Sequence, residues 1–191
     1  MTTRATVHAD TFVQDKLPPR DLWPTMDSGG VAELAYPDRF NAASRLLDKW
    51  VESGQGDRTA LHHVDGPWTY RRLFETANRI AHVLVDDCGL VPGGRVLLRS
   101  ANHPMLVATW FAVIKAGGVA VTTMPLLRVR ELTDIIDKAG VSLAVTDTRV
   151  AGDLEAALAG RAGARIVRFN SFRPDTLEAL LAPKPAALAS M

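Results

Sequence analysis

Short apolar segments alternate with longer helix-like segments along the middle of the sequence, and no other feature limits the fold of this chain as strongly. The short segments are rich in Val and Leu, as buried strands are, and the longer ones show the apolar spacing of helices. The expected strands are residues 59–64, 68–70, 95–99, 119–123, 143–146 and 165–169, and helices are expected from about residue 70 and over 103–116 and 130–139. This alternation predicts an α/β fold: a doubly wound, mostly parallel sheet with helices on both faces.

The two ends of the chain depart from this pattern. The stretch L-P-P-R-D-L-W-P-T-M-D-S-G-G contains three prolines and two glycines and has no sustained periodicity, which indicates irregular structure. The final L-A-P-K-P-A-A-L-A-S-M has the composition of a linker. We therefore expect an extended N-terminal arm over residues 1–40, an α/β unit over residues 41–182 and a truncated linker over residues 183–191.

A first helix is expected directly after the arm. Asn41 is a suitable N-cap, because its side-chain oxygen can accept a hydrogen bond from a free amide of the first turn. Apolar residues recur with helical spacing, so we expect one face of this helix to carry Ala43, Leu46, Leu47 and Trp50.

Composition and charge exclude several classes of protein. The chain has 22 Lys and Arg against 21 Asp and Glu, so its net charge of +1 gives no electrostatic reason to expect nucleic acid or an acidic membrane as a partner. The longest apolar run, residues 105–114, is too short to span a bilayer, and the first residues lack the apolar core of a signal peptide. The single cysteine, Cys88, suits a reducing compartment and is expected to be structural. A cytoplasmic location is therefore expected.

The paired glycines Gly117 and Gly118 invite comparison with a phosphate-binding loop. Such a loop follows a strand and opens a helix, because amides at a helix N-terminus point at the anion. Here the order is helix, glycines, strand, so a helix C-cap and a sharp turn are expected instead. The sequence also lacks G-x-x-x-x-G-K-[ST] and any strand-to-helix glycine fingerprint, which disfavours a P-loop enzyme and an NAD or flavin binder.

The histidines give no catalytic or metal-binding motif. His62 and His63 are adjacent on an expected strand, so their side chains should point to opposite faces and could not bind one metal ion together. Neither H-E-x-x-H nor G-x-S-x-G is present. From local chemistry alone we predict no catalytic residue and no metal site in this chain.

Two segments are more specific than any of these patterns. W-T-Y-R-R-L (residues 68–73) opens a helix and resembles the L-T-Y-x-E-L signature of acyl- and aryl-CoA ligases and adenylation domains. V-I-K-A-G-G-V-A-V-T-T-M-P-L-L-R-V-R-E-L (residues 113–132) resembles the second signature of that superfamily, in which a K-A-G turn leads into a strand and a proline loop.

Three further segments, residues 8–24, 36–48 and 79–99, look like the aryl-CoA branch. The chain thus resembles, over residues 8–183, the N-terminal subdomain of an acyl/aryl-CoA synthetase of the adenylate-forming (AMP-binding) superfamily. Among its members, 2-aminobenzoate–CoA ligases and benzoate–CoA ligases are the most similar.

This resemblance implies a two-step reaction. ATP and a small aromatic carboxylic acid would give an acyl-adenylate and pyrophosphate, and the thiol of CoA would then displace AMP. ATP, Mg²⁺ and CoA are the implied cofactors of the parent enzyme. The family's T-S-G-T-T-G-x-P-K loop and its later motifs are absent from the sequence. We therefore expect a truncated ligase that is inactive alone, binds none of these cofactors tightly and normally has the remainder of the ligase chain as its partner.

By position in related ligases, Pro125 and Arg149 are candidates for the CoA side, although the sequence alone favours a structural proline turn and a surface arginine at these positions. Two readings of the whole chain stay open. As a ligase fragment it should expose an apolar surface and self-associate. The alternative is a stand-alone, non-catalytic α/β module that binds a ligand or a protein.

Overall fold

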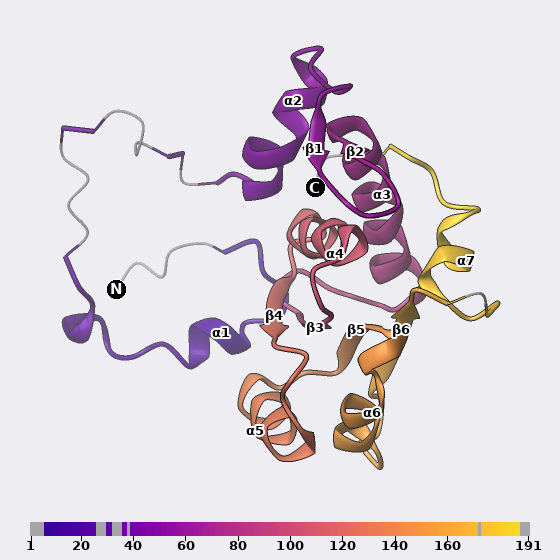
Figure 1. The fold of residues 1–191 in the computed structure, drawn as a ribbon. Helices are drawn as coiled ribbons and strands as arrows, with labels where there is room; N and C mark the ends of the chain where they lie inside the picture. Colours follow the sequence, from indigo (N-terminus) through magenta and orange to yellow (C-terminus); the bar gives the residue numbers. More distant parts are fainter. Residues whose placement is uncertain (1–5, 26–29, 32–35, 38, 172, 188–191) are drawn as a thin grey trace.

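The computed structural model describes residues 6–25, 30–31, 36–37, 39–171 and 173–187. Its centre is a four-stranded parallel sheet with the strand order β4-β3-β5-β6 (Figure 1). The strands are β3 (Arg95–Arg99), β4 (Val119–Thr123), β5 (Leu143–Asp147) and β6 (Arg165–Phe169). The predicted α/β fold with a parallel sheet is confirmed, and these four strands begin where the sequence pattern placed them.

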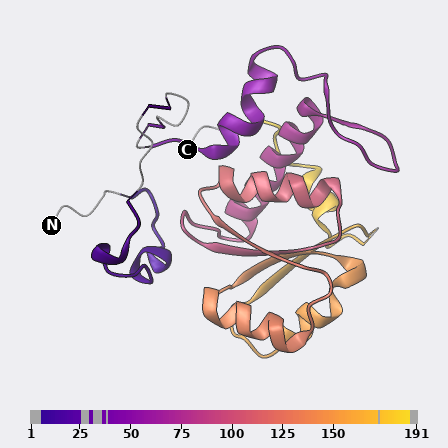
Figure 2. The same cartoon turned by 60° about the vertical axis from the view of Figure 1, so that its left-hand side comes forward.

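Helices cover both faces of the sheet (Figure 2). On one face lie α3 (Tyr70–His82) and α4 (Pro104–Lys115), and on the other lie α5 (Val129–Ala139) and α6 (Gly152–Leu158). Strand β3 shows how one apolar run serves both layers: Val96 and Leu98 belong to the core under α3 and α4, whereas Leu97 belongs to the core under α5 and α6. For this reason, a strand that is buried on both faces has a continuous apolar run in its sequence.

The remaining elements are short. They are α1 (Phe12–Asp15), η1 (Arg20–Leu22), η3 (Ser44–Asp48), α2 (Lys49–Glu52), β1 (Thr59–Leu61), β2 (Trp68–Thr69), η4 (Val83–Asp87), η5 (Thr148–Val150) and α7 (Leu177–Leu181). Strands β1 and β2 form a separate antiparallel pair. The expected strand over 59–64 was too long, because β2 offers only two residues for pairing and the ladder ends at Leu61.

The first helix also differs from expectation at one position. Asn41 does accept a hydrogen bond from the Ala43 amide (3.0 Å), and Ala43 and Leu47 are fully buried. Leu46, however, is 53% exposed, so its predicted place on the same face as Ala43 and Leu47 was wrong. The segment η3 that contains Leu46 is a π-helix, whose wider turn changes which side of the helix each residue faces.

Part of the N-terminal arm is attached to the start of β3. The Arg95 guanidinium pairs with the Asp10 carboxylate (2.5 Å) and lies 4.4 Å from the centre of the Phe12 ring. The hydrogen bond from Arg95 holds the pKa of Asp10 below its ordinary value. Gly93, at φ +88°, leaves no room for a side chain, since a Cβ atom there would lie 2.1 Å from the Asp10 carbonyl oxygen.

The last described residues lie along α3 and η4 instead of leaving the surface. The Asn78 amide donates to the Ala186 carbonyl (2.7 Å), and His82 Nε2 lies 3.0 Å from the Ala187 carbonyl. Lys184 pairs with Asp87 (2.8 Å). These contacts place residues 184–187 beside the helix layer that contains α3.

Candidate functional site

Ligands of open α/β sheets bind beyond the carboxyl ends of the parallel strands. In this chain β3 ends at Arg99, β4 at Thr123, β5 at Asp147 and β6 at Phe169. Because the strands are parallel and in register, these four residues lie along one edge of the sheet. We call this edge, with the loops that leave it, the carboxyl edge.

A buried arginine is the centre of the carboxyl edge. The Arg99 side chain is 1% exposed, and its guanidinium donates to four backbone carbonyls. The acceptors are Met124 (2.9 Å), Pro125 (2.9 Å), Leu127 (2.8 Å) and Val150 (2.9 Å). Burial lowers the pKa of Arg99, and the Asp153 carboxylate, 3.9 Å away, opposes that effect. One side chain thus links the loop after β4 to the segment after β5.

A second arginine lies on a buried carboxylate at the same edge. Asp147 is 1% exposed and accepts from the Arg149 amide (2.8 Å), from Arg149 Nη2 (2.7 Å) and from Asn170 Nδ2 (3.2 Å). Burial raises the pKa of Asp147, but these hydrogen bonds outweigh burial and leave the pKa below its ordinary value. The Arg149 side chain itself is 62% exposed. Its guanidinium is therefore oriented by Asp147 while remaining open to solvent.

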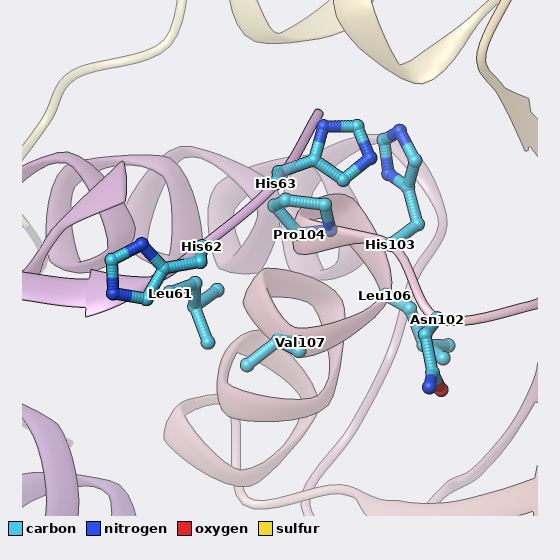
Figure 3. Close-up of a pocket in the computed structure, with 8 residues that line it drawn as sticks. All are labelled: Leu61, His62, His63, Asn102, His103, Pro104, Leu106 and Val107. Carbon is cyan, nitrogen blue, oxygen red and sulfur yellow. The ribbon is translucent and has the colours of Figure 1, made fainter. Parts of the chain in front are cut away.

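A pocket lies beside the N-terminus of α4 (Figure 3). Its volume is about 270 Å³, and its lining consists of Leu61, His62, His63, Asn102, His103, Pro104, Leu106 and Val107. The His63 ring meets the His103 ring edge-on at 4.9 Å, and His103 lies 5.4 Å from the Phe169 ring. His62 and His63 follow the end of β1 instead of belonging to the strand, and Figure 3 shows their rings pointing away from each other.

Comparison with known proteins places the chain in a family. The sequence profile of a family described as AMP-binding enzyme matches residues 47–186, most of the α/β unit. The chain belongs to the AMP-binding enzyme family. The predicted superfamily is thereby confirmed, whereas its most similar branch remains a prediction.

Individual relatives of this AMP-binding family member include ligases for different acids. It is 30% identical over 130 residues to the 3-hydroxybenzoate–CoA/4-hydroxybenzoate–CoA ligase of Thauera aromatica, which covers 64% of the chain and 25% of that protein. It is 27% identical over 136 residues to the long-chain-fatty-acid–CoA ligase of Escherichia coli O6:H1, covering 71% of the chain and 24% of that protein. The chain thus spans about a quarter of these two relatives.

Solved structures of CoA ligases also superpose on this chain. The benzoate CoA ligase of Burkholderia xenovorans LB400 superposes with a TM-score of 0.68 at 25% identity, covering 80% of this chain and 30% of that one. The anthranilate CoA ligase AuaEII superposes with a TM-score of 0.74 at 21% identity, covering 82% and 30%. At that identity the second match supports the shared fold alone.

The C-terminus of α4 in this family member does not have the geometry of a phosphate-binding loop. Gly117, at φ +70°, follows the C-terminus of α4, as predicted, so its neighbourhood offers carbonyls and not amides. At the other end of α4 the Met105 amide already donates to His103 Nδ1 (3.1 Å). Within the described ranges no three His, Cys, Asp or Glu side chains are grouped so that they could hold a metal ion, and no helix is long and apolar enough to cross a membrane.

The two residues predicted from the sequence, Pro125 and Arg149, both lie at the carboxyl edge. Arg99 donates hydrogen bonds to the Pro125 carbonyl and to the carbonyl of Val150, the residue after Arg149. Sequence reasoning missed Arg99, although a charged residue ending the apolar run V-L-L is an available signal. Asp147 was missed as well, since its burial becomes visible only in the folded chain.

Cys88 is half-buried, and burial raises the pKa of its thiol, which agrees with a structural role.

Acidification is expected to destabilise the chain through His103. Its ring nitrogen accepts the Met105 amide only when unprotonated, and burial, with His63 next, lowers its pKa below the ordinary 6.5. Asp147 and Glu178 oppose this shift, and Arg149 adds to it. Between the lowered pKa of His103 in the folded chain and its ordinary pKa in the unfolded chain, the unfolded chain binds more protons. The contribution of His103 to the free energy of unfolding is therefore fully present above about pH 6.5 and is lost as the pH falls below that value.

The measurement is urea unfolding at pH 7.5 and 5.5 on the wild type and on His103→Asn, which keeps a capping oxygen but does not titrate. The loss of stability on acidification should be smaller in the variant. An equal loss in both proteins would show that His103 does not contribute to it.

Proposed function

We propose that this chain is the N-terminal part of an ATP-dependent acid–CoA ligase that acts on a small aromatic carboxylic acid. In the first step a carboxylate oxygen attacks the α-phosphorus of ATP and pyrophosphate leaves. In the second step the sulfur of CoA attacks the acyl carbon, AMP leaves and the thiol proton passes to solvent. The match to the AMP-binding family over residues 47–186 carries this proposal.

The aromatic substrate class rests on narrower support. A hydroxybenzoate–CoA ligase and a benzoate CoA ligase are among the relatives at 30% and 25% identity. The relatives also include a long-chain-fatty-acid–CoA ligase at 27% identity, a nonribosomal peptide synthetase and a tripeptide synthetase, so the matched region is shared with enzymes that are not named for aromatic acids. The segments over residues 8–24, 36–48 and 79–99 are what favours the aryl branch.

Within such an enzyme we assign Pro125 and Arg149 to the CoA side. Arg149 is held by a buried carboxylate and is still 62% exposed, so its guanidinium is oriented and can meet a phosphate group of the coenzyme. No acceptor within the described ranges bonds to its third guanidinium nitrogen, Nη1. Pro125 shapes the loop beside it, whose neighbours Met124 and Leu126 are 60% and 76% exposed.

The partner proposed for this chain is the remainder of the ligase. One side of α4 carries apolar side chains that the described residues cover only in part: Leu106, Val107, Trp110, Phe111 and Ile114. A surface of this kind suits packing against another part of the same enzyme, and in its absence it would favour self-association of the chain. Because the family's T-S-G-T-T-G-x-P-K loop is absent from the sequence, the chain alone is proposed to be inactive.

The test compares the 191-residue chain with the longer native protein, identified by its mass with an antibody against residues 41–182. Each is given ATP, Mg²⁺, CoA and benzoate, 2-aminobenzoate or decanoate. The longer protein should exchange pyrophosphate with ATP and form an aryl-CoA thioester, while the chain alone does neither. Exchange by the chain alone would overturn its proposed inactivity. A native protein no longer than this chain would overturn the ligase proposal and favour a binding module.

A further inference from the structure

We propose that Arg99 is a positioning residue for CoA, which holds the loop of Pro125 and the segment of Arg149 in the arrangement that the coenzyme binds. This inference rests on the proposed function and goes beyond it, because Arg99 is buried and would act through the backbone of both segments. Its side chain is 1% exposed, so it is not itself a ligand of the coenzyme.

The contacts of Arg99 divide between the two segments. Two Nη2 hydrogen bonds and one Nη1 hydrogen bond reach Pro125 (2.9 Å), Leu127 (2.8 Å) and Met124 (2.9 Å) in the loop after β4. Nε reaches Val150 (2.9 Å), the residue after Arg149. A single rigid, planar group therefore fixes the spacing between the two segments.

The loop after β4 depends on these bonds more than on its own side chains. Met124 and Leu126 are mostly exposed and contribute little packing. Leu127 does pack against the core under α5 and α6, but it anchors only the end of the loop. The backbone carbonyls at 124, 125 and 127 all accept hydrogen bonds from the Arg99 guanidinium, whose several donors in one plane can serve three acceptors at once.

Lysine cannot replace this arrangement. A lysine ammonium group keeps the positive charge and has three donors, but it is a compact point charge. It cannot reach all four of the carbonyls that surround the planar guanidinium of Arg99. Arg99→Lys should therefore keep a folded sheet while loosening both segments. Arg99→Gln is the second variant, since it removes the charge and retains a planar donor of shorter reach.

The experiment uses the full-length ligase with Arg99→Lys, Arg149→Ala and the double variant. We expect Arg99→Lys to raise the KM for CoA about tenfold or more, while pyrophosphate exchange, which needs no CoA, stays within about twofold of the wild type. If Arg99 acts by placing Arg149, the double variant should be little worse than the more impaired single variant. Independent, multiplied losses would indicate a general structural role and would overturn the proposal.

Other outcomes are equally decisive. An active wild type whose KM for CoA is unchanged in both Arg99→Lys and Arg99→Gln would overturn this inference and leave the proposed function standing. A wild type that forms no thioester would overturn the proposed function itself. If neither variant folds, hydrogen exchange of the wild type decides: CoA should protect residues 124–127 and 148–150 together, and protection of neither segment would refute the assignment.

Discussion

Asp48→Ala is expected to lower the free energy of unfolding by about 3–5 kcal/mol, because it leaves a buried lysine without its counter-ion. Asp48 Oδ1 lies 2.5 Å from Lys115 Nζ, and the two side chains are 14% and 6% exposed. Lys115 Nζ also lies 4.5 Å from the centre of the Phe74 ring, in surroundings that cannot solvate an unpaired charge. Apart from Lys115, no donor within the described ranges reaches Asp48 Oδ1. Urea unfolding at pH 7.5 measures the effect.

The matched control is Asp57→Ala. Asp57 likewise pairs with a positively charged side chain, that of Arg71, at 3.3 Å, but the Asp57 side chain is 89% exposed, so no measurable loss of stability is expected. The double variant Asp48→Leu/Lys115→Met should be more stable than Asp48→Ala, since it removes both charges and fills the space with apolar groups. A double variant less stable than Asp48→Ala would show that the pair acts through something other than a buried charge.

Phe169→Ala is expected to cost a similar amount, about 3–5 kcal/mol, through the cavity it leaves. Phe169 is fully buried at the end of β6, in the core under α3 and α4, and its ring lies 5.4 Å from His103. The same measurement on Phe40→Ala is the control, because Phe40 is 48% exposed and, among the residues that the structure describes, its ring stacks only on Tyr36. A loss below about 1 kcal/mol in Phe169→Ala would mean that the site collapses around the missing ring.

The sheet and its helices could be predicted because their signals are local. Four strands and the amphipathic helix α5 follow directly from apolar spacing, and the K-A-G-G turn follows from the order of helix, glycines and strand. Leu46 was misplaced because its segment is a π-helix, and the apolar spacing of the sequence does not indicate the wider turn of such a helix. The strand at 59–61 was overextended because its length depends on a partner strand distant in sequence.

The candidate site was predictable only in part. Pro125 and Arg149 were selected through a family resemblance, and nothing in their neighbours indicated that one side chain connects them. Among the described residues the Arg99 guanidinium donates hydrogen bonds only to backbone carbonyls, and such acceptors have no sequence signature because every residue carries one. The burial of Asp147 likewise follows from its place at the end of a central strand, which requires the strand order to be known.

Strand β3, R-V-L-L-R, has a charged residue at each end, and both are used in the same way. Arg95 bonds to the carbonyls of Gly93, Ala139 and Gly140, as Arg99 does to those of four residues at the opposite end. Neither end of the strand can therefore fray without releasing several charge-assisted hydrogen bonds at once. These bonds couple β3 to the loops at both of its ends, and we therefore expect local opening at either end of the strand to occur as part of one cooperative unfolding unit.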